Sequence, residues 1–142
     1  MADMFYGDGD SCNTIPTQAI SGTTPVVSFV EMRRLDDVSF QLITSGTVAG
    51  TWLIEASNNF VAAMNGNAYG SVSNGTATGT FTDVTAMFTV PAGTAIVNPA
   101  GSTTNQFVMP KTRMRCRTLR ITFTPSAGAG NVTALVNAKS WG

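Results

Sequence analysis

The sequence contains no histidine, and charged side chains are scarce. Only 11% of the 142 residues are Asp, Glu, Lys or Arg, against about a quarter in an average globular protein. The absence of histidine excludes Ser-His-Asp and Cys-His catalysis and histidine-ligated zinc. The eight basic and eight acidic residues balance to a net charge of zero, which argues against a strongly basic nucleic-acid-binding protein and against an acidic disordered chain.

Long apolar runs and closely spaced cysteines are also missing. No apolar stretch approaches the roughly 18 residues of a membrane span. The N-terminus, MADMFYGDGD, has neither the basic nor the apolar region of a secretory signal, so we expect synthesis in the cytoplasm and no membrane contact. Cys12 and Cys116 lie far apart and form no metal-binding pair, so we expect two free thiols, no metal and no other cofactor. A disulfide between them requires that the protein reach an oxidising compartment.

The abundant residue types are those of strands and turns. Thr and Val suit pleated sheets, and Gly, Asn and Ser suit turns. The pattern predicts an all-β protein: a single antiparallel β-sandwich, jelly-roll or immunoglobulin-like, with about seven or eight strands in residues 25–142. Residues 1–24 carry three Asp and no base, with Gly and Pro interspersed. We therefore predict an extended, irregular N-terminal arm over residues 1–24.

Alternation of apolar and polar residues locates the strands. The clearest predicted strands are residues 26–32, 38–44, 51–57, 114–124 and 131–138. Weaker candidates lie at 81–90, 95–97 and 106–109, and the polar stretch 62–80 is predicted to be a long loop.

Two local features qualify these predictions. Met114 and Cys116 are out of phase with Leu119, which predicts a β-bulge near Arg117 or Thr118. Asp83 is placed to cap a single helical turn, but its β-branched neighbours favour loop or strand.

Most of the basic residues fall in one stretch, namely Lys111, Arg113, Arg115, Arg117 and Arg120. The spacing of Arg113, Arg115 and Arg117 places them on one face of an extended segment. They form either a solvated face neutralised by neighbours or a strip for phosphate or an acidic partner. Because the first ten residues are acidic, we also predict a contact between the arm of one subunit and the strip of the next. The candidate interface residues are Asp3, Asp8, Asp10, Arg113, Arg115 and Arg117.

No group of acidic residues is typical of a catalytic or metal site. Asp36 and Asp37 are adjacent, and Glu55 is the only further candidate, so an enzyme would have to use these three. A turn with local ion pairs is the simpler interpretation of the Asp pair. Trp52 alternates with Ile54 and is predicted to lie in the core, whereas Trp141 is the candidate for stacking on a sugar.

Two stretches resemble motifs of small β-sandwich structural proteins of bacteriophage virions. Residues 50–58, GTWLIEASN, resemble the strand G-x-W-x-[IV]-E-x-S-N of that family. Residues 118–134, TLRITFTPSAGAGNVTA, resemble its C-terminal hairpin Y-x-R-[IV]-x-[YF]-T-P-[ST]-x-G-x-G. These stretches cover only a small part of the chain.

The resemblance implies a non-enzymatic virion protein: a capsid decoration or cement protein, or an accessory protein of the head or tail. Its partners would be copies of itself and other virion proteins, such as the major capsid protein or a head or tail protein, without direct nucleic-acid contact. The alternative is a carbohydrate- or receptor-binding module with the same fold.

Overall fold

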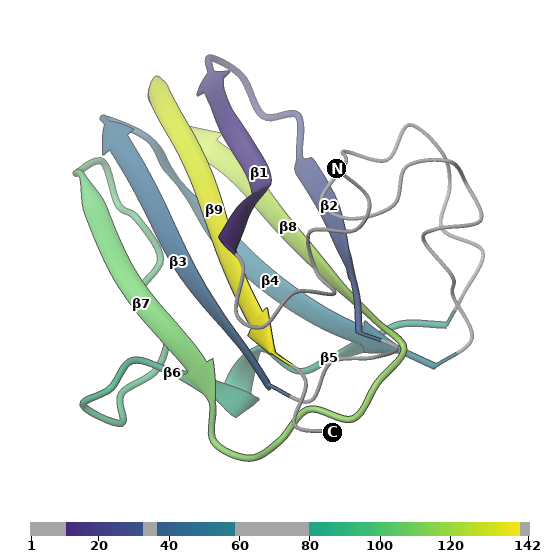
Figure 1. Ribbon diagram of the computed structural model, residues 1–142. Coiled ribbons are helices and arrows are strands. Elements are labelled where there is room, and N and C mark those ends of the chain that lie inside the picture. Colours follow the sequence, from purple (N-terminus) through teal and green to yellow (C-terminus); the bar gives the residue numbers. More distant parts are fainter. Residues whose placement is uncertain (1–10, 33–36, 59–79, 140–142) are drawn as a thin grey trace.

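Two antiparallel sheets pack face to face in the computed structural model, which describes residues 11–32, 37–58 and 80–139 (Figure 1). One sheet has the strand order β1-β9-β3-β7-β6, and the other has the order β2-β8-β4-β5. The strands are β1 (Ser11–Ile20), β2 (Val26–Glu31), β3 (Asp37–Gly46), β4 (Ala49–Ser57), β5 (Thr82–Asp83), β6 (Phe88–Thr89), β7 (Thr104–Pro110), β8 (Thr118–Ala127) and β9 (Gly130–Lys139). The predicted all-β architecture of two packed antiparallel sheets is confirmed.

The core lies between the sheets, and the regular strands β3 and β9 contribute alternate residues to it. In β3 every second residue from Val38 to Thr44 is buried, as the alternation predicts. Trp52, 2% exposed, packs on Phe123 with ring centroids 4.8 Å apart, so its predicted core position is confirmed. Phe40 and Phe88 form a second aromatic pair at 5.7 Å. Burial of side chains of this size stabilises the fold by about 1.5–3 kcal/mol each.

The β3–β4 and β8–β9 turns interlock at one end of the sandwich. The Thr47 amide donates a 2.8 Å hydrogen bond to the Ala129 carbonyl. The Ala129 amide in turn donates to Oγ1 of Thr47 at 3.2 Å. Gly128 has φ +80°, and a Cβ there would collide with the Thr47 backbone. This turn therefore requires glycine for its conformation and for the close approach.

The outer edge of β4 is covered by side chains and loop backbone in place of a long strand. The Gly50 amide donates to the Pro99 carbonyl at 3.1 Å, and the Trp52 amide donates to Oδ1 of Asn98 at 3.0 Å. The Ile54 amide donates to Oγ1 of Thr85 at 2.9 Å. Because these donors are satisfied, β4 needs only the two-residue strand β5 beside it.

Residues 11–20 do not belong to an irregular arm. They form β1, which pairs with β9, so that part of the arm prediction is wrong. Ile15 and Ile20 are both buried, although an odd spacing would place them on opposite faces of a regular strand. The register shift between Ile15 and Gln18 brings the two side chains to the same core. Together with a second shift between Asn13 and Ile15, it hides the strand from the alternation pattern. Residues 1–10 lie outside the described part of the chain.

The predicted bulge near Arg117 or Thr118 is also wrong. Residues 114–117 precede β8 and are not part of it, which explains their change of phase. The register shift of β8 lies at its other end, where Ala49 pairs with Ala127 and Gly50 with Pro125.

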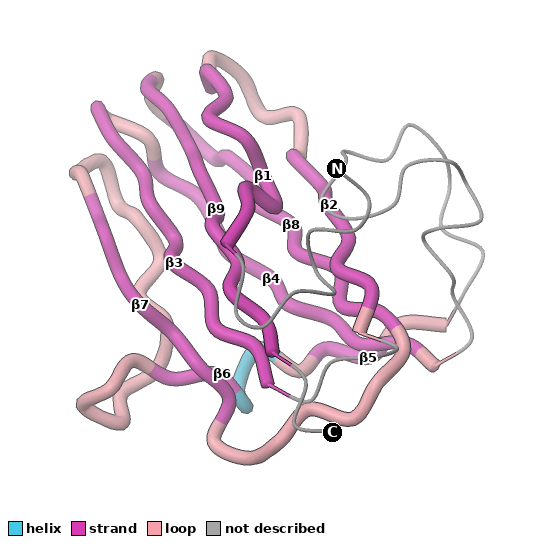
Figure 2. The backbone as a smooth tube through the Cα atoms, viewed as in Figure 1, coloured by secondary structure: helices cyan, strands magenta, loops and turns pink. Residues whose placement is uncertain are grey.

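The segment between residues 81 and 97 is less regular than expected. β5 and β6 flank a 3-10 turn, Thr85–Met87, which is coloured cyan in Figure 2. Oδ1 of Asp83 accepts a 2.9 Å hydrogen bond from the Thr85 amide, so Asp83 does begin a turn. The candidate strand 95–97 is reduced to an isolated bridge at Ala95.

The predicted loop 62–80 falls outside the described residues except for Thr80. Among the elements that are described, no helix has the length and apolar character needed to cross a membrane.

Candidate functional site

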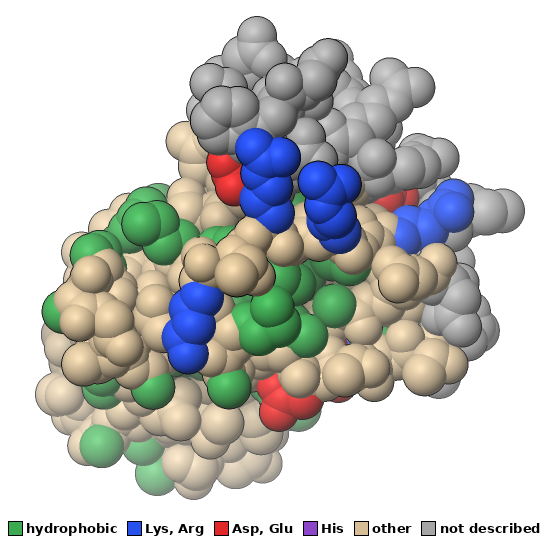
Figure 3. Space-filling model, turned by 90° about the horizontal axis from the view of Figure 1, so that it is seen from below, with side chains coloured by type: hydrophobic (Ala, Val, Ile, Leu, Met, Phe, Trp, Pro, Cys, Tyr) green, Lys and Arg blue, Asp and Glu red, His purple; other side chains and the backbone are tan. Residues whose placement is uncertain are grey.

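The basic stretch lies on the connection from β7 to β8, at the end of the sandwich opposite the interlocked turns (Figure 1). Arg113 and Arg115 are exposed, and Met114 between them is buried. Figure 3 views this end and shows Lys and Arg side chains around a patch of hydrophobic side chains. We call the three exposed basic residues of this connection the basic rim: Lys111, Arg113 and Arg115.

Arg117 differs from the basic rim because it is partly buried and tied to both neighbouring strands. Its amide donates to the Ser57 carbonyl at 3.0 Å, and its carbonyl accepts from the Met32 amide at 2.7 Å. Its Nε is buried and has no hydrogen-bond partner in the described structure. The alternation of arginines in the sequence therefore does not give three equivalent side chains.

Arg120 lies on β8 in the four-stranded sheet and forms an ion pair there. Its Nη2 lies 2.8 Å from Oε1 of Glu55, and its Nε donates to the same oxygen at 2.9 Å. The guanidinium group also lies 3.9 Å from the ring centroid of Phe81, which packs on Phe29. Side-chain exposures of 23% for Arg120 and 14% for Glu55 show that this ion pair is largely shielded from water.

The acids considered for catalysis are not brought together. Asp37 lies on β3 in the five-stranded sheet, whereas Glu55 lies on β4 in the other sheet and pairs with Arg120. Asp36 falls outside the described residues. Over the described ranges, no three His, Cys, Asp or Glu residues are grouped as metal ligands would be.

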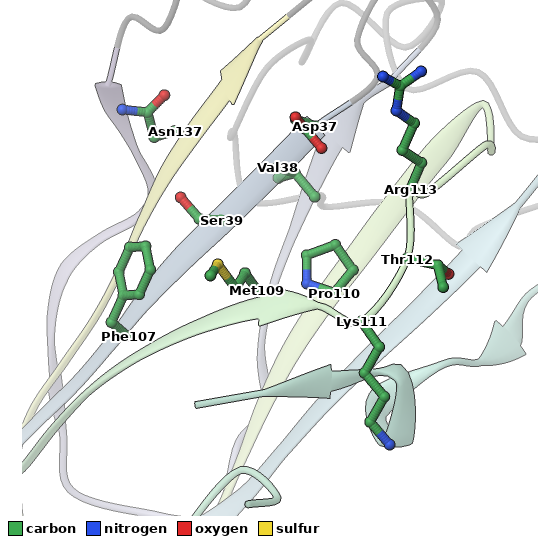
Figure 4. A pocket seen from close by; sticks show the side chains of 10 residues that line it. All are labelled: Asp37, Val38, Ser39, Phe107, Met109, Pro110, Lys111, Thr112, Arg113 and Asn137. Carbon is green, nitrogen blue, oxygen red and sulfur yellow. The ribbon is translucent and has the colours of Figure 1, made fainter. Parts of the chain in front are cut away.

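An open pocket of about 420 Å³ lies beside the basic rim (Figure 4). Phe107 and Met109, 44% and 42% exposed, line it together with Pro110 at the end of β7. The other lining residues are Asp37, Val38, Ser39, Lys111, Thr112, Arg113 and Asn137. We call this site the β7 pocket.

Phe107 is exposed and its neighbour Gln106 is buried, although hydrophobicity alone predicts the opposite. Gln106, 8% exposed, points into the sandwich while the more apolar Phe107 points out. The reason is that the Gln106 amide group bonds both backbone groups of Val97, accepting from its N–H at 2.8 Å and donating to its carbonyl. The sequence carried one usable signal: the apolar residues of 104–110 do not all fit one face. Exposed large apolar side chains grouped in this way are typical of an interaction site.

A second open pocket, of about 400 Å³, lies on the other side of Arg113. Arg115, Cys116, Ser57 and Met87 contribute to its lining. Cys116 is a free thiol. Burial, aided by the negative charge of Glu31, raises the pKa of the Cys116 thiol to about 11. This cysteine is therefore protonated at neutral pH and is a poor nucleophile.

The remaining candidate residues belong to the two ends of the chain. Asp3, Asp8, Asp10 and Trp141 are outside the described residues, as is the side chain of Cys12. The predicted contact between the acidic arm and the basic strip therefore stays a prediction. No protein-family model matches the chain, and no curated protein or solved structure is detectably similar to it.

Proposed function

We propose that this protein is a non-enzymatic structural component of a bacteriophage virion, either a capsid decoration or cement protein or an accessory protein of the head or tail. It acts in the virion, after synthesis in the host cytoplasm, by binding copies of itself and other virion proteins. Its mechanism is shape and charge complementarity, without a cofactor, direct nucleic-acid contact or membrane contact.

Strand order is the observation that carries this proposal, because it supports a jelly-roll sandwich. If the short strand β6 is left aside, the sheets read β1-β9-β3-β7 and β2-β8-β4-β5. Eight strands ranked by sequence then have the orders 1-8-3-6 and 2-7-4-5. These orders match those of a jelly roll, and this match supports the jelly-roll type that we propose. Jelly rolls are common in viral capsid proteins and in lectins.

The positions of the two resembling stretches add support. Residues 50–57 fall on β4, residue 58 follows it directly, and residues 118–134 fall on the β8–β9 hairpin. β4 and β8 pair directly, with Trp52 opposite Phe123 and Glu55 opposite Arg120. The residues that carry the resemblance thus lie next to one another and include the core aromatic pair and the shielded ion pair.

A carbohydrate- or receptor-binding module is the second candidate function. The β7 pocket favours it, because an exposed aromatic ring, a carboxylate and an amide line one open site. Aromatic faces beside polar groups of this kind suit sugars as well as peptides.

The experiment that separates the two functions is the solution mass of the purified protein, measured by size-exclusion chromatography with light scattering over a wide concentration range. We expect a discrete closed homo-oligomer. A glycan array with the same sample provides the comparison. A monomer at every concentration that binds a defined glycan would overturn the assembly proposal and favour the binding module.

A further inference from the structure

We propose that residues 1–10 of one copy of the chain dock into the β7 pocket and along the basic rim of a second copy. This inference rests on the proposed function, because it supplies the contact by which copies assemble. It names the apolar pocket as the anchor and the basic rim as the electrostatic part of the contact.

The pocket offers the apolar half of such a site. Phe107 and Met109 keep 44% and 42% of their surface exposed, and Pro110 extends the same apolar surface. Figure 4 shows Phe107, Met109 and Pro110 on one side, with Asp37, Ser39 and Asn137 across from them. Burial of exposed aromatic and methionine side chains is the usual source of affinity at interface anchors.

Residues 1–10 have the complementary chemistry. The segment MADMFYGDGD places Met4, Phe5 and Tyr6 together and carries three Asp with no Lys or Arg. Its apolar residues match the pocket, and the Asp residues that follow at 8 and 10 match the basic rim. Because Met4, Phe5 and Tyr6 come before Asp8 and Asp10, the apolar residues can enter the pocket while these two acidic residues contact the basic rim.

The segment also begins at the right place. Ser11, the first residue of β1, pairs with Asn137, which lines the β7 pocket. Only β9 and β3 separate β1 from β7, a span of about 14 Å at ordinary strand spacing. Ten extended residues reach at most about 36 Å. In a two-fold pair whose pockets face each other, each segment therefore starts beside one pocket and can reach the other.

The charges that face the pocket restrict how the segment lies. Asp37, Arg113 and Asn137 each have interactions of their own, so the ionic part of the argument rests on Lys111 and Arg115. Figure 4 shows the Lys111 side chain pointing away from Phe107 and Met109. The acidic residues therefore lie along the rim outside the pocket, while the apolar residues enter it. Asp37 is the one acid in the pocket lining, and it disfavours an Asp inside.

Photo-cross-linking of the full-length protein tests this contact directly. The variant Met109→benzoylphenylalanine is prepared in isotopically heavy and light forms, mixed, irradiated and digested for mass spectrometry. We expect cross-links from position 109 to residues 1–10 that join heavy to light chains. Cross-links confined to one chain would mean that the segment occupies its own pocket, and cross-links to another region would mean that it does not enter the pocket; either result overturns the inference.

Two variants quantify the anchor and the ionic contact. Phe107→Ser should weaken self-association about tenfold or more by sedimentation analysis. Val97→Ser is the control, because Val97 is 57% exposed but does not line the pocket, and it should leave association unchanged. Lys111→Asp should also weaken association, and adding Asp8→Lys should restore part of it. If the unmodified protein forms oligomers but the Met109→benzoylphenylalanine variant gives no cross-links to residues 1–10, this inference alone is contradicted. An unmodified protein that is always monomeric contradicts the proposed function as well.

Discussion

The interlocked turns predict a large difference between two glycine substitutions with similar backbone angles. Gly128 has φ +80° and Gly93 has φ +85°, so alanine is strained at both positions by about 1–2 kcal/mol. At Gly93 no atom lies within 4 Å of the added Cβ, whereas at Gly128 the Cβ would collide with the backbone of Thr47. Only Gly128→Ala forces the β3–β4 and β8–β9 turns apart.

The magnitude follows from the bonds that the movement breaks. Separating the turns costs the hydrogen bonds between Thr47 and Ala129, about 0.5–1.5 kcal/mol each, in addition to the strain. We therefore expect Gly128→Ala to lower the free energy of unfolding by about 2–5 kcal/mol and Gly93→Ala by about 1–2 kcal/mol. In a domain of this size the melting temperature should fall by roughly 10 °C for the first variant and roughly 5 °C for the second.

Urea unfolding followed by tryptophan fluorescence measures both values, because Trp52 lies in the core. The m-value should stay constant, which shows that the change acts on the folded state. Equal losses of stability in the two variants would refute the reasoning, since strain alone would then account for both.

Three further predictions concern side chains inside the fold. A double-mutant cycle with Arg120→Met and Glu55→Gln should give a coupling energy of about 1 kcal/mol that decreases in high salt, and zero coupling would show that the 2.8 Å ion pair contributes nothing. The pKa of about 11 at Cys116 predicts alkylation at pH 8 roughly a hundredfold slower than that of an ordinary thiol, followed for the Cys116 peptide by mass spectrometry. Because the fold raises the pKa of Cys116, the protonated thiol contributes to stability fully below pH 9, and this contribution is lost as the pH rises through about 11. A urea unfolding midpoint that stays constant across this pH range would contradict the prediction. Gln106→Leu should destabilise the protein by about 1 kcal/mol or more in urea unfolding, although leucine is more apolar, because both backbone groups of Val97 lose their partner; a neutral or stabilising result would contradict this role.

The sequence was sufficient for the strands whose alternation is uninterrupted. Val38, Phe40 and Leu42 of β3 and the alternate residues of β9 from Val132 to Ala138 are buried as their spacing predicts. β1 could not be predicted, because the register shift between Ile15 and Gln18 makes Ile15 and Ile20 share a face that a regular strand would not give them. Alternation identifies a strand only where the register is continuous.

The candidate site was less accessible to sequence reasoning. The cluster of bases was visible, but the separation of Arg117 and Arg120 from the basic rim depends on contacts with Ser57 and Glu55, which lie far away along the chain. The β7 pocket was missed because hydrophobicity places Phe107 inside and Gln106 outside. Two contacts favour the opposite: Gln106 bonds both backbone groups of Val97, and Val108 on the same face of β7 is fully buried.

The covered edge of β4 has a consequence for crowding. An open edge strand is a template on which another chain can add, and the risk of fibril growth rises where many copies are held close together. Here Asn98, Pro99 and Thr85 already occupy the amides that such a chain would bind. Copies can therefore be packed densely along this edge without joining their sheets into a continuous aggregate.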